Sequence, residues 1–215
     1  MIQKQKKKII ITFIVLIIIN FAIIFASIKD GQGNNDPMYR FRERQAVTFI
    51  SALTLGLTSL TALSIYLLKK KTQPLQEKVK FWLFSAIGFF YLCIDEYFMA
   101  HEGIDEWVGS WFGQNIKEMN LDNLVIASFG IIALMLCLYF RKVIFKNKIM
   151  LPFFLLGGLG LAGTIIFHSF ERINIYYEVA EESFKLVGVT SFFSAYLLAF
   201  LTFKNEISIS KINPL

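Results

Sequence analysis

The chain has 215 residues, of which 55% are hydrophobic and only 18% are charged. A water-soluble domain carries about 25% charged residues, so these figures nearly exclude a soluble enzyme. The 23 phenylalanines and the long apolar runs also exclude a disordered or collagen-like chain. The net charge of +6 does not by itself indicate nucleic acid, and we expect none as a partner, because in so apolar a chain the position of the basic residues matters more than their sum.

Six apolar stretches are expected to cross a membrane, because a bilayer core about 30 Å thick needs about 20 apolar residues per helix. They are residues 9–27, 46–68, 81–100, 121–140, 149–167 and 183–203. The connecting segments are short, and no linker or internal repeat divides the chain. Residues 1–215 are therefore expected to form one domain, an all-α bundle of six transmembrane helices. The first apolar stretch is longer than that of a secretory signal peptide, so we expect a retained signal-anchor helix.

The basic residues predict the orientation of these helices. If the N-terminus is cytoplasmic, the inner segments hold fifteen Lys or Arg residues and the outer loops hold six. This difference agrees with the positive-inside rule, and it predicts that both termini lie in the cytoplasm. The lipid bilayer is thus the first expected partner.

Two stretches rich in small residues predict close helix packing. The second of the six apolar stretches, 46–68, carries Ser and Thr on one face, and the fifth, 149–167, is rich in glycine. Small and hydroxylated residues allow helices to approach closely and to form hydrogen bonds with one another, which we prefer to a Ser- and Thr-lined pore. The residues are Thr48, Ser51, Thr54, Thr58 and Thr61, then Gly157, Gly158, Gly160 and Gly163, with Gly158 and Ala162 as a small-xxx-small pair.

Between the third and fourth stretches, residues 104–112 have apolar side chains at helical spacing, including Trp107 and Trp111. Tryptophan prefers the membrane interface, so this segment is expected to form an amphipathic helix lying on the outer surface.

Ionisable residues gather at the expected outer ends of four helices. Inside a membrane each costs about 2.5–3.5 kcal/mol at a helix centre, so such groups usually face a protein or water interior. They are Asp95, Glu96, His101 and Glu102 of the third stretch, Asp122 of the fourth, His168 and Glu171 of the fifth, and Glu178, Glu181, Glu182 and Lys185 of the sixth. This coincidence is the strongest functional signal in the sequence.

The residue types in this cluster are typical of a divalent metal site. Carboxylate and imidazole ligands suit zinc, iron or manganese without selecting among them. The candidate ligands are His101, His168, Glu181 and Glu182, and the candidate general bases for a metal-bound water are Asp95, Glu96 and Glu171. Glu102, Glu178 and Lys185 complete the cluster.

A simpler interpretation explains the same residues without a site. The glutamates of the sixth stretch would be solvated groups that the helix dipole favours at a helix N-terminus. Lys185 would extend outward to pair with them.

The element Glu181-Glu182-Ser183-Phe184-Lys185 resembles the E-E-x-x-K element of PrsW-type bacterial intramembrane metalloproteases. In that family the element lies in a membrane helix, and its glutamates are implicated in zinc-dependent peptide cleavage. The family's essential histidine follows the element, whereas both histidines of this chain precede it. The strings DEYFMAHE (95–102) and EESFKLVG (181–188) are also similar to a pairing in uncharacterised bacterial multipass membrane proteins. That similarity implies that the two segments form one site.

Three functions remain open at this point, all in a bacterial cytoplasmic membrane. The slightly preferred one is a metal-dependent hydrolase that acts on a lipid or a membrane peptide entering beneath residues 104–112. The second is a proton- or cation-coupled transporter, channel or sensor, with Lys185 as an internal counter-ion. The third is a non-catalytic assembly protein that packs on a partner through its glycine-rich helix.

Overall fold

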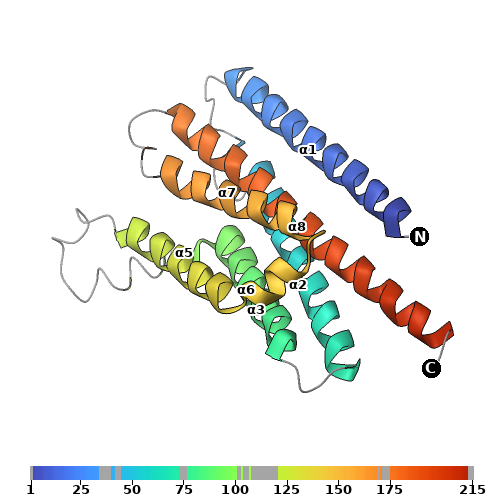
Figure 1. The fold of residues 1–215 in the computed structure, drawn as a ribbon. Coiled ribbons are helices and arrows are strands. Elements are labelled where there is room, and N and C mark those ends of the chain that lie inside the picture. Colours follow the sequence, from blue (N-terminus) through green and yellow to red (C-terminus); the bar gives the residue numbers. More distant parts are fainter. Residues whose placement is uncertain are drawn as a thin grey trace.

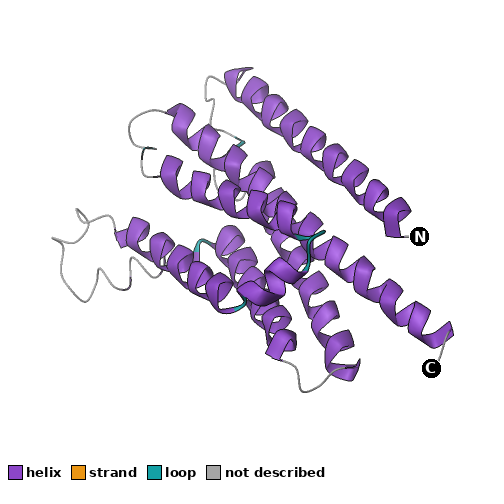
Figure 2. Cartoon of the chain, viewed as in Figure 1, coloured by secondary structure: helices purple, strands orange, loops and turns teal. Residues whose placement is uncertain are grey.

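The computed structural model of the chain describes residues 2–33, 40–41, 45–72, 77–100, 103, 107, 121–168, 170 and 175–212. The regular structure of these residues is helical throughout, with no strand among them (Figure 2). The helices are α1 (Ile2–Gly33), α2 (Ala46–Thr72), α3 (Glu77–Phe98), α5 (Leu121–Tyr139), α6 (Arg141–Lys146), α7 (Leu151–His168) and α8 (Ile175–Ile212). The expected all-α class is confirmed.

Five of these helices are long and apolar enough to cross a membrane: Ile10–Gly33, Ala46–Thr72, Val79–Phe98, Leu151–His168 and Tyr176–Ile207. The chain therefore has the architecture of a helical, multi-pass membrane protein. The remaining expected span, 121–140, corresponds to α5, whose shorter apolar part is Ala127–Tyr139. Six spans thus stay a prediction, as do the sides of the membrane on which the termini lie.

Helix α8 is the central element of the bundle and lies against α7, α2 and α1 (Figure 1). In the most apolar segment of α8, 67% of the residues are buried, whereas in that of the peripheral α1 only 17% are buried. The N- and C-terminal ends of the chain lie at the same end of the bundle (Figure 1). Helix α8 begins at Ile175, eight residues before the expected span, so the acidic residues 178, 181 and 182 lie within the helix.

Glycines bring α7 and α8 into backbone contact. A Cβ atom added to Gly160 would lie 2.5 Å from the Cα atom of Gly188, and the rings of Phe192 and Phe184 fill the space beside Gly157 and Gly163. The predicted packing role is thus met within the chain at these glycines.

The Gly158–Ala162 pair differs from the expectation. Both residues are exposed, and no atom lies within 4 Å of a Cβ atom built on Gly158. The contact face repeats every three residues, at 157, 160 and 163, and this spacing turns position 158 away from α8.

The Ser and Thr residues of α2 mostly pack or bond locally. Thr48, Ser51 and Thr58 are buried, and the Thr58 hydroxyl donates to the carbonyl of Thr54 one turn earlier. Ser59, outside the expected stripe, donates to the carbonyl of Ala86 in α3. These contacts agree with the packing interpretation.

A polar residue for which the sequence predicted no role, Asn20, holds α1 against α8. The Asn20 side chain is buried, and its amide donates to Thr190 Oγ1 at 2.6 Å. In a membrane, interhelical hydrogen bonds of this kind join helices that are otherwise equally apolar.

Candidate ionic site

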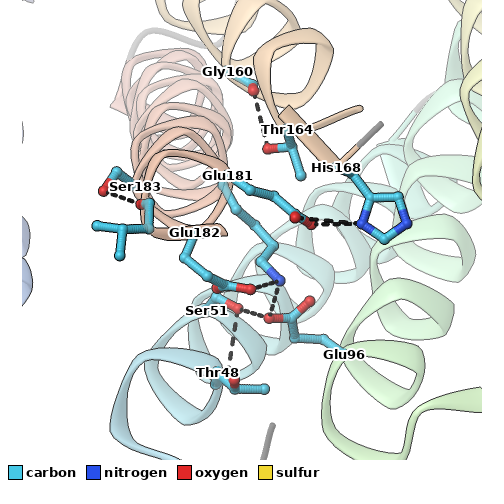
Figure 3. Close-up of polar contacts among 11 residues, drawn as sticks. Thr48, Ser51, Glu96, Gly160, Thr164, His168, Glu181, Glu182 and Ser183 are labelled. Atoms are coloured by element: carbon cyan, nitrogen blue, oxygen red, sulfur yellow. Dashed lines mark hydrogen bonds and ion pairs between the residues drawn. The ribbon is translucent and has the colours of Figure 1, made fainter. Parts of the chain in front are cut away.

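Polar side chains from four helices meet in one cluster (Figure 3). The helix ends that carry them lie at the end of the bundle opposite the chain termini (Figure 1). Ser51 lies near the start of α2, Glu96 near the end of α3, and His168 at the end of α7. Glu181, Glu182 and Lys185 occupy the second and third turns of α8. The fold therefore brings together helix ends that are far apart in the sequence.

Lys185 is shared by two carboxylates. Its Nζ atom lies 2.7 Å from Glu182 Oε1 on the preceding turn of α8 and 3.0 Å from Glu96 Oε1 on α3. The exposed fractions of these side chains are 17% for Lys185, 10% for Glu182 and 12% for Glu96, so the ion pairs lie in the protein interior. The Ser51 hydroxyl also donates to Glu96 Oε1, which adds α2 to the cluster. We call Ser51, Glu96, Glu182 and Lys185 the ionic network.

The second carboxylate oxygen of Glu182 is left without a protein partner. Oε2 is buried, and no hydrogen-bonding group of the described part of the chain contacts it. A buried acceptor without a partner costs about 1–3 kcal/mol. With one ammonium shared by two carboxylates, the network has capacity for a further positive charge.

A second acid–base pair joins α7 to α8. His168 Nδ1 lies 3.2 Å from Glu181 Oε1 and 3.3 Å from Oε2, and both side chains are largely buried. Glu181 and Glu182 are adjacent in sequence, so they point about 100° apart around the helix. Glu181 consequently meets α7, while Glu182 lies with the partners from α2 and α3 (Figure 3). We call His168 and Glu181 the His–Glu pair.

The other predicted site residues fall into two groups. Asp95 is buried beside Glu96 on α3, and Glu178 is half-buried one turn before Glu181–Glu182 on α8. His101, Glu102 and Glu171 lie outside the described residues, as does the expected interfacial helix 104–112 except for Trp107, whose side chain is exposed. Their expected roles stay predictions.

Helix α3 ends at Phe98, two residues before the expected end, in an unusual backbone conformation. Met99 has a φ of 57°, in the left-handed region that non-glycine residues seldom adopt. This bend comes three residues after Glu96, at the edge of the ionic network.

Ser51 was not predicted from the sequence to belong to the site. Its place in a stripe of hydroxyl residues favoured a packing role, and the Ser51 hydroxyl does also reach the Thr48 carbonyl at 3.3 Å. Its position six residues into the second expected span, at the same end as the charged cluster, was the available signal.

The described metal-ligand candidates form pairs rather than a larger set. Among the residues with described positions, no three His, Cys, Asp or Glu side chains converge so that they could hold a metal ion. Glu182 is paired with Lys185, and Glu181 with His168. His101 is outside the described residues, so the four-ligand site stays a prediction.

Fold and site together define a helical, multi-pass membrane protein with a buried acid–base network at one end of its bundle. Residues 9–200 match the family described as "Domain of unknown function (DUF8692)", and the chain belongs to this family. No curated protein matches the chain, and no solved structure matches it.

Proposed function

We propose that this protein is a proton- or cation-coupled transporter of a bacterial cytoplasmic membrane. The observation that carries the proposal is Lys185, whose ammonium is shared by Glu96 and Glu182 inside a bundle of apolar helices. Charged side chains within membrane helices are costly, and they typically mark ion pathways and proton relays.

The surplus of negative charge gives the network two possible states. Without a further cation or proton, Lys185 holds both carboxylates, and Glu182 Oε2 has no partner among the described groups. A proton or a cation bound to Glu182 would weaken the ion pair between Glu182 and Lys185, and Lys185 would then pair with Glu96 alone. Because Glu182 belongs to α8 and Glu96 to α3, loading changes the tie between two helices.

The proposed topology has six spans, both termini in the cytoplasm and the ionic network near the outer face. The positive-inside rule supports the orientation. The positions of Glu96 and His168 support the sixth span. Glu96 lies near the C-terminal end of α3 and His168 at the C-terminal end of α7, and both side chains contact the first turns of α8. The chain must therefore return across the bundle between α3 and α7, and α5, with 19 residues, lies in that interval.

The test is ion flux into vesicles that contain the purified protein and a trapped pH-sensitive dye. Under an imposed membrane potential, and under gradients of Na⁺, K⁺ or Ca²⁺, we expect the wild-type protein to change the internal pH faster than protein-free vesicles do. Glu182→Gln should bring the rate down to that of protein-free vesicles. Glu206→Gln, an exposed glutamate on the same helix, is the matched control and should keep the wild-type rate.

Two outcomes would overturn the proposal. One is a wild-type rate equal to that of empty vesicles under every gradient. The other is a Glu182→Gln rate equal to that of the wild type.

A second candidate function, a metal-dependent hydrolase acting on a lipid or membrane peptide, is favoured by the His–Glu pair. A histidine that binds a metal usually donates from its other ring nitrogen to a carboxylate, a backbone carbonyl or a water, and His168 lies beside the carboxylate of Glu181 in this way. The resemblance of residues 181–185 to the PrsW-type element points the same way. In this case His101, His168 and Glu182 of the predicted ligand set would hold zinc, iron or manganese, and Glu181, the fourth member of that set, would orient the His168 ring.

Elemental mass spectrometry of the detergent-purified protein separates the two functions. Near-stoichiometric zinc, iron or manganese that disappears in the His101→Ala/His168→Ala variant would favour the hydrolase. Wild-type protein without bound metal, after purification free of chelators, would leave the transporter.

A further inference from the structure

The end of the bundle opposite the ionic network carries a group of exposed basic side chains on and beside α6. Arg141, Lys142 and Lys146 lie on this short helix, and Lys148 follows it. Helix α7 separates this group from His168, and its 18 residues span about 27 Å. The basic group and the ionic network therefore lie about one bilayer core apart.

Helix α6 is fixed to the bundle by its apolar side. Ile144 is buried on the helix itself, and Phe140 and Met150 are buried on either side of it. The backbone N–H of Asn147 bonds to the Ile144 carbonyl, and that of Met150 bonds to the Asn147 carbonyl. The four basic side chains consequently project from a backbone that is held in place.

These basic side chains are not neutralised within the described part of the protein. No described carboxylate forms an ion pair with any of the four, and all four are exposed. Lys142 and Lys146 are four residues apart on one helix face, a spacing at which like charges repel. An anion placed between them would convert this repulsion into attraction.

The lysines at the end of α2 differ in this respect. Lys69 lies over the ring of Phe203, with its Nζ atom 4.3 Å from the ring centroid, and Lys70 lies over Tyr66 at 5.7 Å. Of the three lysines in the last turn of α2, Lys69, Lys70 and Lys71, two thus have aromatic partners in the protein, whereas the basic side chains around α6 are exposed.

Large apolar side chains flank the basic group. Phe145 is 60% exposed on α6, and Tyr139 is 68% exposed at the end of α5. Cations beside exposed aromatic rings match the boundary between lipid headgroups and acyl chains, where basic helices bind anionic lipid.

We propose that α6 and Lys148 form a binding site for the headgroup of an anionic phospholipid, with Phe145 and Tyr139 against its acyl chains. Arg141, Lys142, Lys146 and Lys148 supply the positive charge that the phosphate requires. The site is separate from the ionic network, so it stands whether or not the protein transports an ion.

The experiment compares lipid binding by native mass spectrometry of the detergent-purified full chain, titrated with phosphatidylglycerol or phosphatidylcholine. The wild-type protein should bind phosphatidylglycerol in preference. The variant Lys142→Gln/Lys146→Gln/Lys148→Gln should bind it at least about tenfold more weakly, because each basic group near an anionic lipid contributes substantially to binding. The matching variant Lys142→Arg/Lys146→Arg/Lys148→Arg, which keeps the charge, should retain the preference.

The control removes the same charge from the same end of the bundle. Lys69→Gln/Lys70→Gln/Lys71→Gln should lose much less affinity than the α6 variant does. An equal loss in the two variants would overturn the proposal, because binding would then depend on total charge. The absence of any preference in the wild type would overturn it as well. All substituted side chains around α6 are exposed, so an unchanged melting temperature in zwitterionic detergent verifies that the variant is folded.

Discussion

Lys185 lies between carboxylates from two different helices, and this position makes its charge important for stability as well as for function. A buried ion pair adds little when compared with a well-packed apolar replacement of both partners. Removing one partner is costly, because it leaves an uncompensated charge in the interior. The network therefore predicts different results for single and combined substitutions.

We expect Lys185→Met to destabilise the protein by about 3–5 kcal/mol, because it leaves both Glu96 and Glu182 without their common cation. The combined variant Lys185→Met/Glu182→Gln should recover part of this loss, since only one carboxylate would remain. Reversible unfolding in mixed micelles measures both effects. A single variant as stable as the wild type would show that the ion pairs do not form in the folded protein.

The left-handed backbone of Met99 leads to a second prediction. A residue with a Cβ atom pays about 1–2 kcal/mol for this conformation, and glycine does not. We expect Met99→Gly to preserve stability or to raise it by up to about 1 kcal/mol. Phe98→Gly, one residue earlier and still in the helix, should lower stability by about 1 kcal/mol. Thermal unfolding of both variants tests the prediction, and a loss at position 99 as large as that at 98 would contradict it.

The contact between α7 and α8 depends on glycine at two facing positions. At Gly160 an added methyl group would meet the backbone of Gly188, which no side-chain rotation can relieve. The same two helices carry the His–Glu pair, and His168 is eight residues beyond Gly160, about 12 Å along α7. Spacing between these helices thus affects both packing and the polar site.

We expect Gly160→Ala to destabilise the protein by about 1–3 kcal/mol, the usual cost of overpacking a close contact. Gly158→Ala is the matched control: position 158 lies on the same helix in open space, so alanine there should keep the stability or raise it by about 0.5–1 kcal/mol. Melting temperatures of the two variants give the comparison. Equal stability of both would mean that the helices do not cross at Gly160.

The arrangement of all the helices makes a prediction about sidedness. On a background without cysteine (Cys93→Ala/Cys137→Ala), Lys29→Cys near the end of α1 should react with a membrane-impermeant thiol reagent in intact cells. Lys148→Cys, after α6, should react only after permeabilisation, because the proposed topology, with six spans and an inner N-terminus, places it in the cytoplasm. Labelling of both positions from the same side would contradict the six-span topology.

Much of the fold could be predicted from the sequence, because a bilayer imposes one length and one polarity on each spanning helix. The expected 46–68 and 149–167 correspond to α2 and α7 with small shifts at their ends. Helix α8 begins eight residues before the apolar stretch 183–203 that the sequence marks as a span. An apolar stretch ends at its first charged residues, whereas the helix continues through Glu181 and Glu182 because each has a basic partner in the folded protein.

The site was predictable in its residue types, in its place at one end of the bundle and in the pairing of Lys185 with a glutamate of its own helix, but not in its contacts between helices. Which carboxylate meets Lys185 and which meets His168 depends on how each helix is rotated about its axis. That rotation is fixed by contacts such as the Gly160–Gly188 crossing, which involve residues far apart in the sequence. Ser51 was missed for the same reason, because its role depends on a neighbour from another helix.

One short stretch of α8 has consequences for how the sequence can vary. Between positions 181 and 188 the helix presents Glu181 to α7, Glu182 and Lys185 to α3, and Gly188 to the backbone of α7. Inserting or deleting a single residue there would turn everything beyond it by about 100°. The glycine crossing and the polar contacts would then no longer be satisfied together. A substitution in this stretch disturbs the contacts of one side chain, whereas a change of length disturbs all of these contacts at once.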